Sequence, residues 1–274
     1  MLTQPAYARR VSSVTLDRVS SPRGELVLRR DGEHCEIVSN GVFLMDTRDG
    51  RSERELVRAA VARRAGPLRV LLGGLGVGFS LAEALAASAV GAVTVVEVEA
   101  AVVAWHRTHL APYSAGGLDD PRVTVVVADL LAWLGAGTEE YDAVCLDVDN
   151  GPEWTVTPGN AALYGDTGLD AVDRRLAPGG TLAVWSAAEA PAFAVRLRDR
   201  WSTVDTRLVP VRRGGPDVIY LARGRRAAPA AGPAPAVGPA PAAGPATAAV
   251  PALAGGPAPG SASSPAGPTP TTGS

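Results

Sequence analysis

Hydrophobic residues in the middle of the chain fall into short continuous runs, separated by segments with helical spacing. A short apolar run bounded by turn residues indicates a buried strand, whereas apolar positions three and four residues apart indicate a helix. The runs predict strands at Leu68–Leu72, Ala92–Val96, Arg122–Ala128, Asp142–Leu146 and Thr181–Trp185.

The segments between these runs predict helices. One follows the glycine-rich loop Gly73–Gly78 and ends near Ser88, and the others are Ala100–Leu110, Leu130–Leu134, Ala161–Leu176 and Ala190–Trp201. Strands that alternate with helices predict an α/β fold, in which helices cover both faces of a parallel sheet.

Two final strands, about Val204–Val209 and Val218–Ala222, flank the turn sequence RRGGP. So short a connection predicts a hairpin, and therefore one antiparallel strand at the edge of the sheet. Together the runs predict a Rossmann-like sheet of seven strands.

The N-terminal part has a different pattern. Short runs at Gly24–Arg30, His34–Ser39 and Val42–Asp46 are separated by Asp31-Gly32 and Asn40-Gly41. Both dipeptides favour tight hairpin turns, so this part is predicted to be a small β-meander.

A charged segment from Ser52 to Arg64 links the meander to the main domain. Its apolar positions have helical spacing, so it predicts an amphipathic helix with Ser52 as its N-cap and Glu55 three residues later. The five arginines between residues 51 and 64 are most simply a solvated helix face.

Residues 227–274 contain no charged and no aromatic residue, and they hold 12 of the 23 prolines. Such a segment cannot bury enough apolar area to offset the entropy of ordering it. We expect a disordered tail, most simply a spacer and alternatively a docking segment. The predicted organisation is an N-terminal meander and linking helix (1–65), a Rossmann-like domain (66–226) and this tail (227–274).

The composition of the chain limits the classes of partner and the cellular location that we expect. Charged residues make up 20% of the chain and the net charge is −2, which does not favour binding to nucleic acid or to a membrane surface. Cys35 and Cys145 are too few for a disulfide framework or a zinc site, and no run of about 18 apolar residues predicts a spanning helix. The N-terminus lacks the apolar core of a signal peptide, so we expect a cytoplasmic protein.

No metal site is expected, because His34, His106 and His109 are scattered without acids or thiols at ligand spacing. His106 and His109 fall on one helix face beside Trp105, where surface or packing roles are the simplest.

Polar or glycine-rich residues follow four successive predicted strands. Ligands of open parallel sheets bind outside the carboxyl ends of the strands, so these positions are candidate site residues.

Gly74, Gly76 and Gly78 follow the first strand. The pattern is not a dinucleotide fingerprint, because Phe79 and Leu81 stand where a glycine is required, and no Gly-Lys-Ser/Thr of a P-loop follows. It fits a domain that binds S-adenosylmethionine (AdoMet), although a simple tight turn is the alternative.

Acids end the next two strands. Glu97 lies about 20 residues beyond the glycines, where a carboxylate can accept both ribose hydroxyls. Glu99 more simply begins the following helix. Asp129 can accept from an adenine amino group, with Leu130 beside it, or can cap the helix that follows.

The fourth strand ends in Asp147, Asp149 and Asn150, followed by Gly-Pro. If the extended backbone continues, both aspartates point the same way. A carboxylate here can attract a cationic amine, remove its proton and stabilise a sulfonium. The alternative is a capped loop exit. Tyr164 either lines this pocket or packs beneath it.

The ordered motifs VLLGGLGVGFSLAEAL, VTVVEVEAAVVAW, DPRVTVVVADLLAWL, YDAVCLDVDNGP and PGGTLAVWS resemble the spermidine synthase family of aminopropyltransferases. They resemble most closely its bacterial spermidine-synthase-like branch, over roughly residues 22–223. The resemblance implies transfer of an aminopropyl group from decarboxylated AdoMet to putrescine. It also implies that Glu97 binds ribose, Asp129 binds adenine and Asp147 is the catalytic base, and it suggests a homodimer.

The chain departs from the family at several positions. Val77 occupies the place of an acid of the family, Arg51–Glu55 replaces a Tyr-His-Glu stretch, and Asp147–Pro152 replaces Asp-Ser-Ser-Asp-Pro. The nucleotide pocket is thus largely retained, whereas the acids that bind polyamine are partly lost. An AdoMet-dependent methyltransferase and a non-catalytic nucleotide-binding protein are therefore the alternatives.

Overall fold

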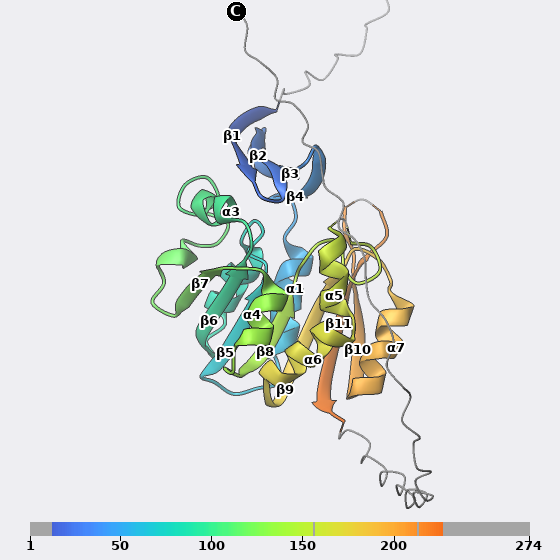
Figure 1. Ribbon diagram of the computed structural model, residues 1–274. Helices are drawn as coiled ribbons and strands as arrows, with labels where there is room; N and C mark the ends of the chain where they lie inside the picture. Colours follow the sequence, from blue (N-terminus) through green and yellow to red (C-terminus); the bar gives the residue numbers. More distant parts are fainter. Residues whose placement is uncertain (1–12, 156, 213, 227–274) are drawn as a thin grey trace, which may run out of the picture. The chain divides into compact units, whose positions relative to one another are not determined.

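The computed structural model describes residues 13–155, 157–212 and 214–226, and two sheets organise them (Figure 1). The larger sheet has seven strands in the order β10-β11-β9-β8-β5-β6-β7. Their bounds are β5 Leu68–Gly73, β6 Val90–Glu97, β7 Val123–Val127, β8 Tyr141–Leu146, β9 Leu176–Ser186, β10 Trp201–Val209 and β11 Asp217–Arg225. The predicted seven-stranded Rossmann-like sheet is confirmed.

The antiparallel strand is not at the edge of the sheet, as predicted, but second from it. β11 pairs antiparallel with both β9 and β10, so β10 is the edge strand. The reason is the order of connections. A helix carries the chain from β9 across to β10, and the hairpin then folds β11 back into the space between them. β11 consequently has neighbours on both sides and is mostly buried, whereas β10 is mostly exposed.

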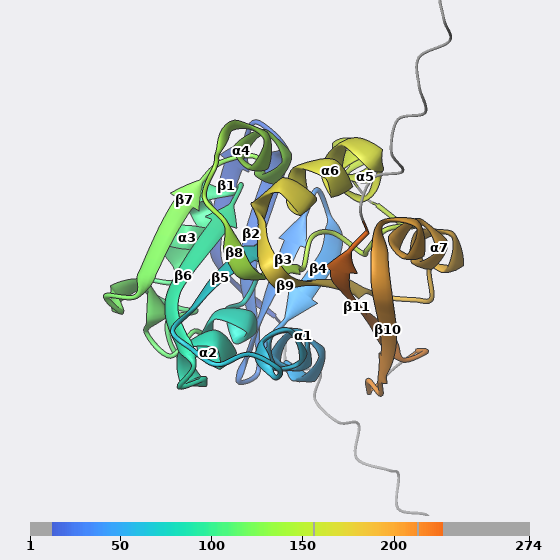
Figure 2. The ribbon, with the colours of Figure 1, turned by 90° about the horizontal axis from the view of Figure 1, so that it is seen from below.

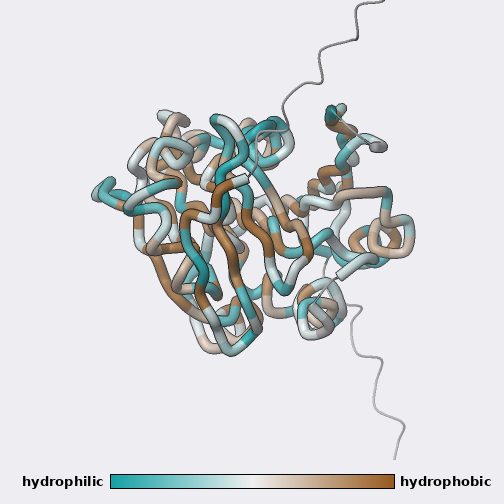
Figure 3. Tube along the Cα trace, turned by 90° about the horizontal axis from the view of Figure 1, so that it is seen from above, coloured by the Kyte–Doolittle hydropathy of each residue, from teal (hydrophilic) through white to brown (hydrophobic). Residues whose placement is uncertain are grey.

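Seven helices of the described residues accompany this sheet. They are α1 Arg51–Val61, α2 Phe79–Ala86, α3 Ala100–Trp105, α4 Leu130–Ala136, α5 Ala161–Tyr164, α6 Asp166–Arg175 and α7 Pro191–Arg200. Figure 2 shows α1 and α2 on one face and α4, α5 and α6 on the other. Alternate strand residues supply two separate cores. Val70 and Leu72 pack with α1 and α2, whereas Leu71 packs with α4 and α6. Seen from above, hydrophobic stretches of the chain run through the middle of the molecule and alternate with hydrophilic ones (Figure 3).

Three predicted helix boundaries are wrong. The helix predicted to reach Leu110 ends at Trp105, after which the chain turns tightly. The helix predicted over residues 161–176 is interrupted at Gly165, whose extended backbone separates α5 from α6. Ser52 is not an N-cap either. α1 begins one residue earlier, after Gly50, and the Ser52 hydroxyl donates to the Glu53 carboxylate.

The N-terminal part is an antiparallel meander in the order β1-β2-β3-β4. Its strands are β1 Val14–Ser21, β2 Gly24–Asp31, β3 His34–Ser39 and β4 Val42–Asp46. The predicted meander is confirmed, and Asn40 and Gly41 both have the positive φ of a tight hairpin. β1 was not predicted, because it is an edge strand with no buried position and so has little apolar pattern.

Side-chain contacts hold the meander over the carboxyl ends of the parallel strands. The Trp105 indole donates to Asp17 on β1 at 2.7 Å, and the Ser21 hydroxyl donates to Glu99 at 3.2 Å. The Tyr113 hydroxyl donates to the carbonyl of Glu33 at 3.2 Å. The meander thereby covers the edge of the sheet at which the candidate residues lie.

The predicted tail, residues 227–274, lies outside the described residues, so its disorder stays a prediction. The predicted division at residues 65 and 66 also stays a prediction. Within the described part of the chain, no helix is long and apolar enough to span a membrane.

Two glycines offer a matched test of this packing. At Gly78, with φ of 100°, an added Cβ would lie 2.6 Å from His106 Cε1. At Gly135, within α4, it would meet no atom within 4 Å. Gly78→Ala should lower the free energy of unfolding by about 1–3 kcal/mol, whereas Gly135→Ala should raise it by up to about 1 kcal/mol. Urea denaturation measures both, and equal effects would contradict the proposed packing.

Candidate active site

A cavity of about 710 Å³ lies at the carboxyl edge of the seven-stranded sheet. Its walls come from β4, the start of α1, the glycine loop, the loop after β8, and the hairpin between β10 and β11. The cavity thus joins elements from the whole length of the described chain.

The glycine loop forms one wall of the cavity, and its conformation requires glycine. Gly74, Gly76 and Gly78 have φ of 94°, 52° and 100°. A Cβ on Gly74 would lie 2.5 Å from the carbonyl oxygen of Asp147, and one on Gly76 would lie 2.9 Å from the sulfur of Met45. The loop therefore approaches both β8 and the meander more closely than any side chain would allow.

His106 supports this loop from behind. Its Nε2 lies 2.9 Å from the carbonyl oxygen of Gly76, and its Nδ1 lies 3.1 Å from the Ser114 hydroxyl. Burial lowers the pKa of His106, which favours the neutral ring. Of the two roles expected for this residue, the structure therefore places it in packing and not at the surface.

Glu97, at the end of β6, is buried and tied to the glycine loop. One carboxylate oxygen accepts the Leu75 N–H at 2.9 Å and the other accepts the Glu99 N–H at 2.8 Å. Burial raises the pKa of Glu97, and these backbone donors oppose that shift. Leu75 lines the cavity, so Glu97 stands directly behind the cavity wall. Glu99 instead accepts from Ser21 of the meander, as noted above.

Asp129 caps a helix, as its alternative role predicted. Its carboxylate accepts the Ala132 N–H at 2.9 Å in the first turn of α4. The other oxygen lies 3.2 Å from the guanidinium of Arg23, at the turn between β1 and β2. Leu130 is buried against Gly73, whose added Cβ would lie 2.6 Å from it. Contact of Asp129 with an adenine stays a prediction.

Three carboxylates gather in the cavity wall. Asp147 follows β8, Glu53 lies in the first turn of α1, and Asp217 begins β11. Each is half-buried, and none forms an ion pair within the part of the chain that the structure describes. Desolvation, together with repulsion from the other two acids, raises the pKa of Asp147 to about 8. Desolvation also raises the pKa of Glu53 to about 7.

Glu53 and Asp217 were not predicted as site residues. Asp217 stands at the start of its strand, whereas the rule for parallel sheets points only to the carboxyl ends of strands. Because β11 runs antiparallel, its start lies at the same edge of the sheet as the ends of the parallel strands. Extending the rule to the first residue of an antiparallel strand would have found Asp217. No sequence pattern marks Glu53 as a site residue, since it is one of many charged residues on a helix that is predicted to be solvated.

The extended backbone that would align Asp149 with Asp147 does not continue past β8. The φ of 60° at Asp149 ends the extended conformation. Its carboxylate accepts the N–H groups of Asn150 at 2.8 Å and Thr157 at 2.9 Å, and the Asn160 amide at 3.0 Å. Asp149 therefore orders the loop, while both it and Asn150 line the cavity.

Tyr164 packs beneath this loop. It is buried, its ring meets that of Phe193 edge-on at 5.8 Å, and its hydroxyl donates to the carbonyl of Val148. It is not among the residues that line the cavity. The structure thus favours the packing role of Tyr164 over the pocket-lining role.

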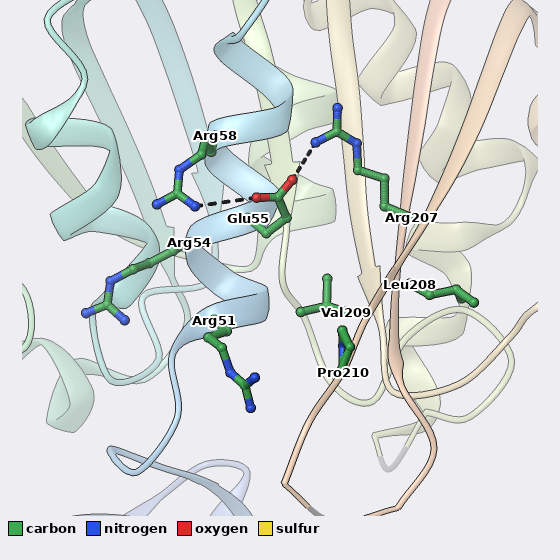
Figure 4. A pocket seen from close by; sticks show the side chains of 8 residues that line it. All are labelled: Arg51, Arg54, Glu55, Arg58, Arg207, Leu208, Val209 and Pro210. Atoms are coloured by element: carbon green, nitrogen blue, oxygen red, sulfur yellow. Dashed lines mark hydrogen bonds and ion pairs between the residues drawn. The ribbon is translucent and has the colours of Figure 1, made fainter.

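The outer side of α1 carries the opposite charge. A shallow hollow of about 590 Å³ lies between α1 and β10, and Figure 4 shows Arg58 and Arg207 on either side of Glu55. Glu55 pairs with Arg58 and with Arg207. Arg54 lies over the Phe79 ring at 4.3 Å. Arg51, Arg58 and Arg64 of the predicted solvated face thus form ion pairs. The same helix presents Glu53, which has no ion pair among the described residues, to the cavity.

Within the described residues, no group of three or more His, Cys, Asp or Glu side chains is arranged to hold a metal ion.

Comparisons with known proteins agree with this geometry. Residues 51–192 match the sequence profile of the spermine/spermidine synthase domain. The polyamine aminopropyltransferase of Mycobacterium tuberculosis is 35% identical over 164 residues, which cover 58% of this chain and 30% of that protein. Putrescine N-methyltransferase 2 of Nicotiana attenuata is 34% identical over 117 residues, covering 42% and 30%.

Among solved structures, a spermidine synthase in complex with the transition-state analogue AdoDATO has the same fold. It superposes with a TM-score of 0.66 and 19% sequence identity, over 77% of this chain and 73% of that one. The matched region spans only about 30% of the length of the Mycobacterium tuberculosis relative.

The raised pKa values predict how stability depends on pH. Asp147 and Glu53 bind protons more tightly in the folded than in the unfolded chain, so the folded state carries excess protons between about pH 5 and 8. The free energy of unfolding should therefore fall by about 1–3 kcal/mol from pH 5.5 to 8.5.

Asp147→Asn should remove much of this fall. Asp120→Asn is the control, because Asp120 pairs with Arg122 outside the cavity. Denaturation curves at the two pH values measure the effect. A wild-type stability that rises over this interval would contradict the assigned electrostatics.

Proposed function

Because the chain belongs to the spermine/spermidine synthase family, as the resemblance of its motifs predicted, we propose that it transfers an aminopropyl group. The donor is decarboxylated AdoMet and the acceptor is an amine such as putrescine. The observation that carries this proposal is the group of unpaired carboxylates beside the glycine loop, in a cavity large enough for small organic ligands.

The glycine loop and the acids behind it supply the donor half of the site. Backbone N–H groups at the start of a helix favour electron-rich groups of a ligand, and α2 begins directly after Gly78. We expect Glu97 to accept the ribose hydroxyls and Asp129 the adenine amino group. These assignments come from the resemblance, and Glu97 lies directly behind Leu75, which lines the cavity.

The charge of the cavity favours the decarboxylated donor. AdoMet carries a carboxylate at the end of its amino acid chain, and the unpaired acids of the cavity would repel it. Decarboxylated AdoMet ends in an ammonium, which the same acids attract. Val77, which replaces an acid of the family, is buried in the loop and adds no charge. The neighbouring carboxylates therefore carry the selection between donors.

The chemistry is an in-line displacement. Asp147 accepts a proton from the acceptor ammonium, and its raised pKa suits a base that works near neutral pH. The amine lone pair then forms a bond to the methylene carbon beside the sulfonium. The carbon–sulfur bond breaks, its electrons go to sulfur, and neutral methylthioadenosine leaves. The cavity contributes by aligning the two substrates and by stabilising the positive charge.

An amine N-methyltransferase is the second candidate. The observation that favours it is the similarity to a putrescine N-methyltransferase reported above. The acceptor half of the site would be the same, and the donor would be AdoMet itself. A homodimer and a cytoplasmic location stay predictions from the sequence.

Direct assays test the proposal and separate the candidates. The purified chain should convert putrescine and decarboxylated AdoMet into spermidine and methylthioadenosine. Asp147→Asn should lower turnover by at least about 100-fold while leaving nucleotide affinity within about tenfold. Asp142→Asn is the matched control, because Asp142 lies at the other end of β8 and pairs with Arg64.

The outcomes of this assay are distinct. Formation of N-methylputrescine from AdoMet, with no spermidine, would establish the second candidate instead. If the chain neither catalyses a reaction nor binds either donor, both candidate activities are refuted. Full activity of Asp147→Asn would show that another group is the base.

Glu97→Ala tests the donor site separately. Loss of charge-assisted hydrogen bonds to the ribose should weaken binding of methylthioadenosine by about 2–3 kcal/mol. Glu99→Ala is the control, since Glu99 faces Ser21 of the meander. Calorimetric titration measures both variants, and thermal unfolding without ligand shows whether the loop is intact. Equal affinities in the two variants would refute the role of Glu97.

A further inference from the structure

Asp217 occupies a position in the cavity that its neighbours fix. It is the first residue of β11, and one of its carboxylate oxygens accepts the indole N–H of Trp185 at 3.1 Å. Trp185 lies near the end of β9, opposite Ile219 in the ladder, and it also lines the cavity. Adjacent strands therefore hold the carboxylate of Asp217 in a defined orientation at the cavity wall.

Most other acids of the cavity are already engaged. Arg48 forms ion pairs with Asp31, Glu36 and Asp46, and the Glu36 carboxylate also pairs with Arg29. Asp49 pairs with Arg51. Asp149 accepts the N–H donors of its own loop, as described above.

The remaining acids are Glu53, Asp147 and Asp217. Glu53 accepts only from the hydroxyl of Ser52, and Asp217 only from the Trp185 indole, among the hydrogen bonds of the described residues. Neither donor carries a charge. The cavity therefore holds three carboxylates that form no ion pair in the described part of the chain, while Arg212 in its wall acts electrostatically on Asp49.

We infer that Asp217 is a specificity-determining residue, which together with Glu53 holds the second, non-reacting ammonium of a diamine or longer polyamine. This inference rests on the proposed function. Asp147 is then left to face the amine that reacts. The inference assigns to the hairpin between β10 and β11 a direct part in choosing the acceptor.

The charge balance supports this assignment. Three carboxylates near one another repel, and each cation that enters relieves part of this repulsion. A monoamine supplies one positive charge, whereas a diamine supplies two. The advantage of the diamine should therefore depend on the number of carboxylates. Removing the charge of Asp217 should reduce the affinity for the diamine and leave that for the monoamine nearly unchanged.

Calorimetric binding in the presence of saturating methylthioadenosine tests the inference without turnover. The probes are putrescine and butylamine, which have the same carbon chain but two ammonium groups and one. Asp217→Asn should weaken putrescine at least about 30-fold and change butylamine less than about threefold, on the scale of a lost buried charge partner. In steady-state assays the KM for putrescine should rise much more than kcat falls.

Two further variants complete the design. Asp205→Asn is the control, because Asp205 lies on the neighbouring strand β10 and pairs with Arg223. Asp217→Glu retains the charge and should restore most of the preference for putrescine. It also keeps the test open if Asp217→Asn does not fold.

The binding and turnover results distinguish failure of the inference about Asp217 from failure of the proposed reaction. Equal losses for the two amines, or no loss for either, would overturn the inference, as would a wild-type protein that binds putrescine no better than butylamine. A wild-type protein that prefers putrescine but forms no spermidine would overturn the proposed reaction instead. In that case the Asp217→Asn comparison would still report on the ammonium site.

Discussion

Close backbone packing at the glycine loop is the constraint on which the candidate site depends. Gly74 approaches the backbone of Asp147, Gly76 approaches Met45 of the meander, and Gly78 approaches His106. Since all three have positive φ, no larger residue could keep both the conformation and the distances. This junction sets the meander over the edge of the sheet and leaves the cavity beneath it.

The cavity concentrates negative charge at a cost in stability. Carboxylates that are half-buried without a cation partner are destabilising, and their pKa values rise in response. Arg48 in the cavity wall pairs with acids of the meander, and Arg207 pairs with Glu55 on the outer side of α1. Arg212 also lines the cavity, where it acts electrostatically on Asp49. Such an arrangement disfavours the empty folded protein but favours binding of a cationic ligand.

The positions that match the family motifs supply too few carboxylates for a diamine. In the folded chain Glu53 and Asp217, which come from other elements, lie in the same cavity wall as Asp147. The matched region covers about 30% of the Mycobacterium tuberculosis relative, so other parts of that protein can contribute to its activity.

Sequence patterns alone determined the sheet, the meander, the glycine loop and the strand-end acids Glu97, Asp129 and Asp147, because each depends on local periodicity or on a residue's place in a strand. Helix ends at Trp105 and Gly165 were missed, since tight turns and backbone geometry overrode apolar spacing. The place of β11 inside the sheet, the packing of Tyr164 and the meeting of Glu53 with Asp217 were decided only by the tertiary structure. These features depend on contacts between residues far apart in the chain, and such contacts leave no periodic trace in the order of amino acids.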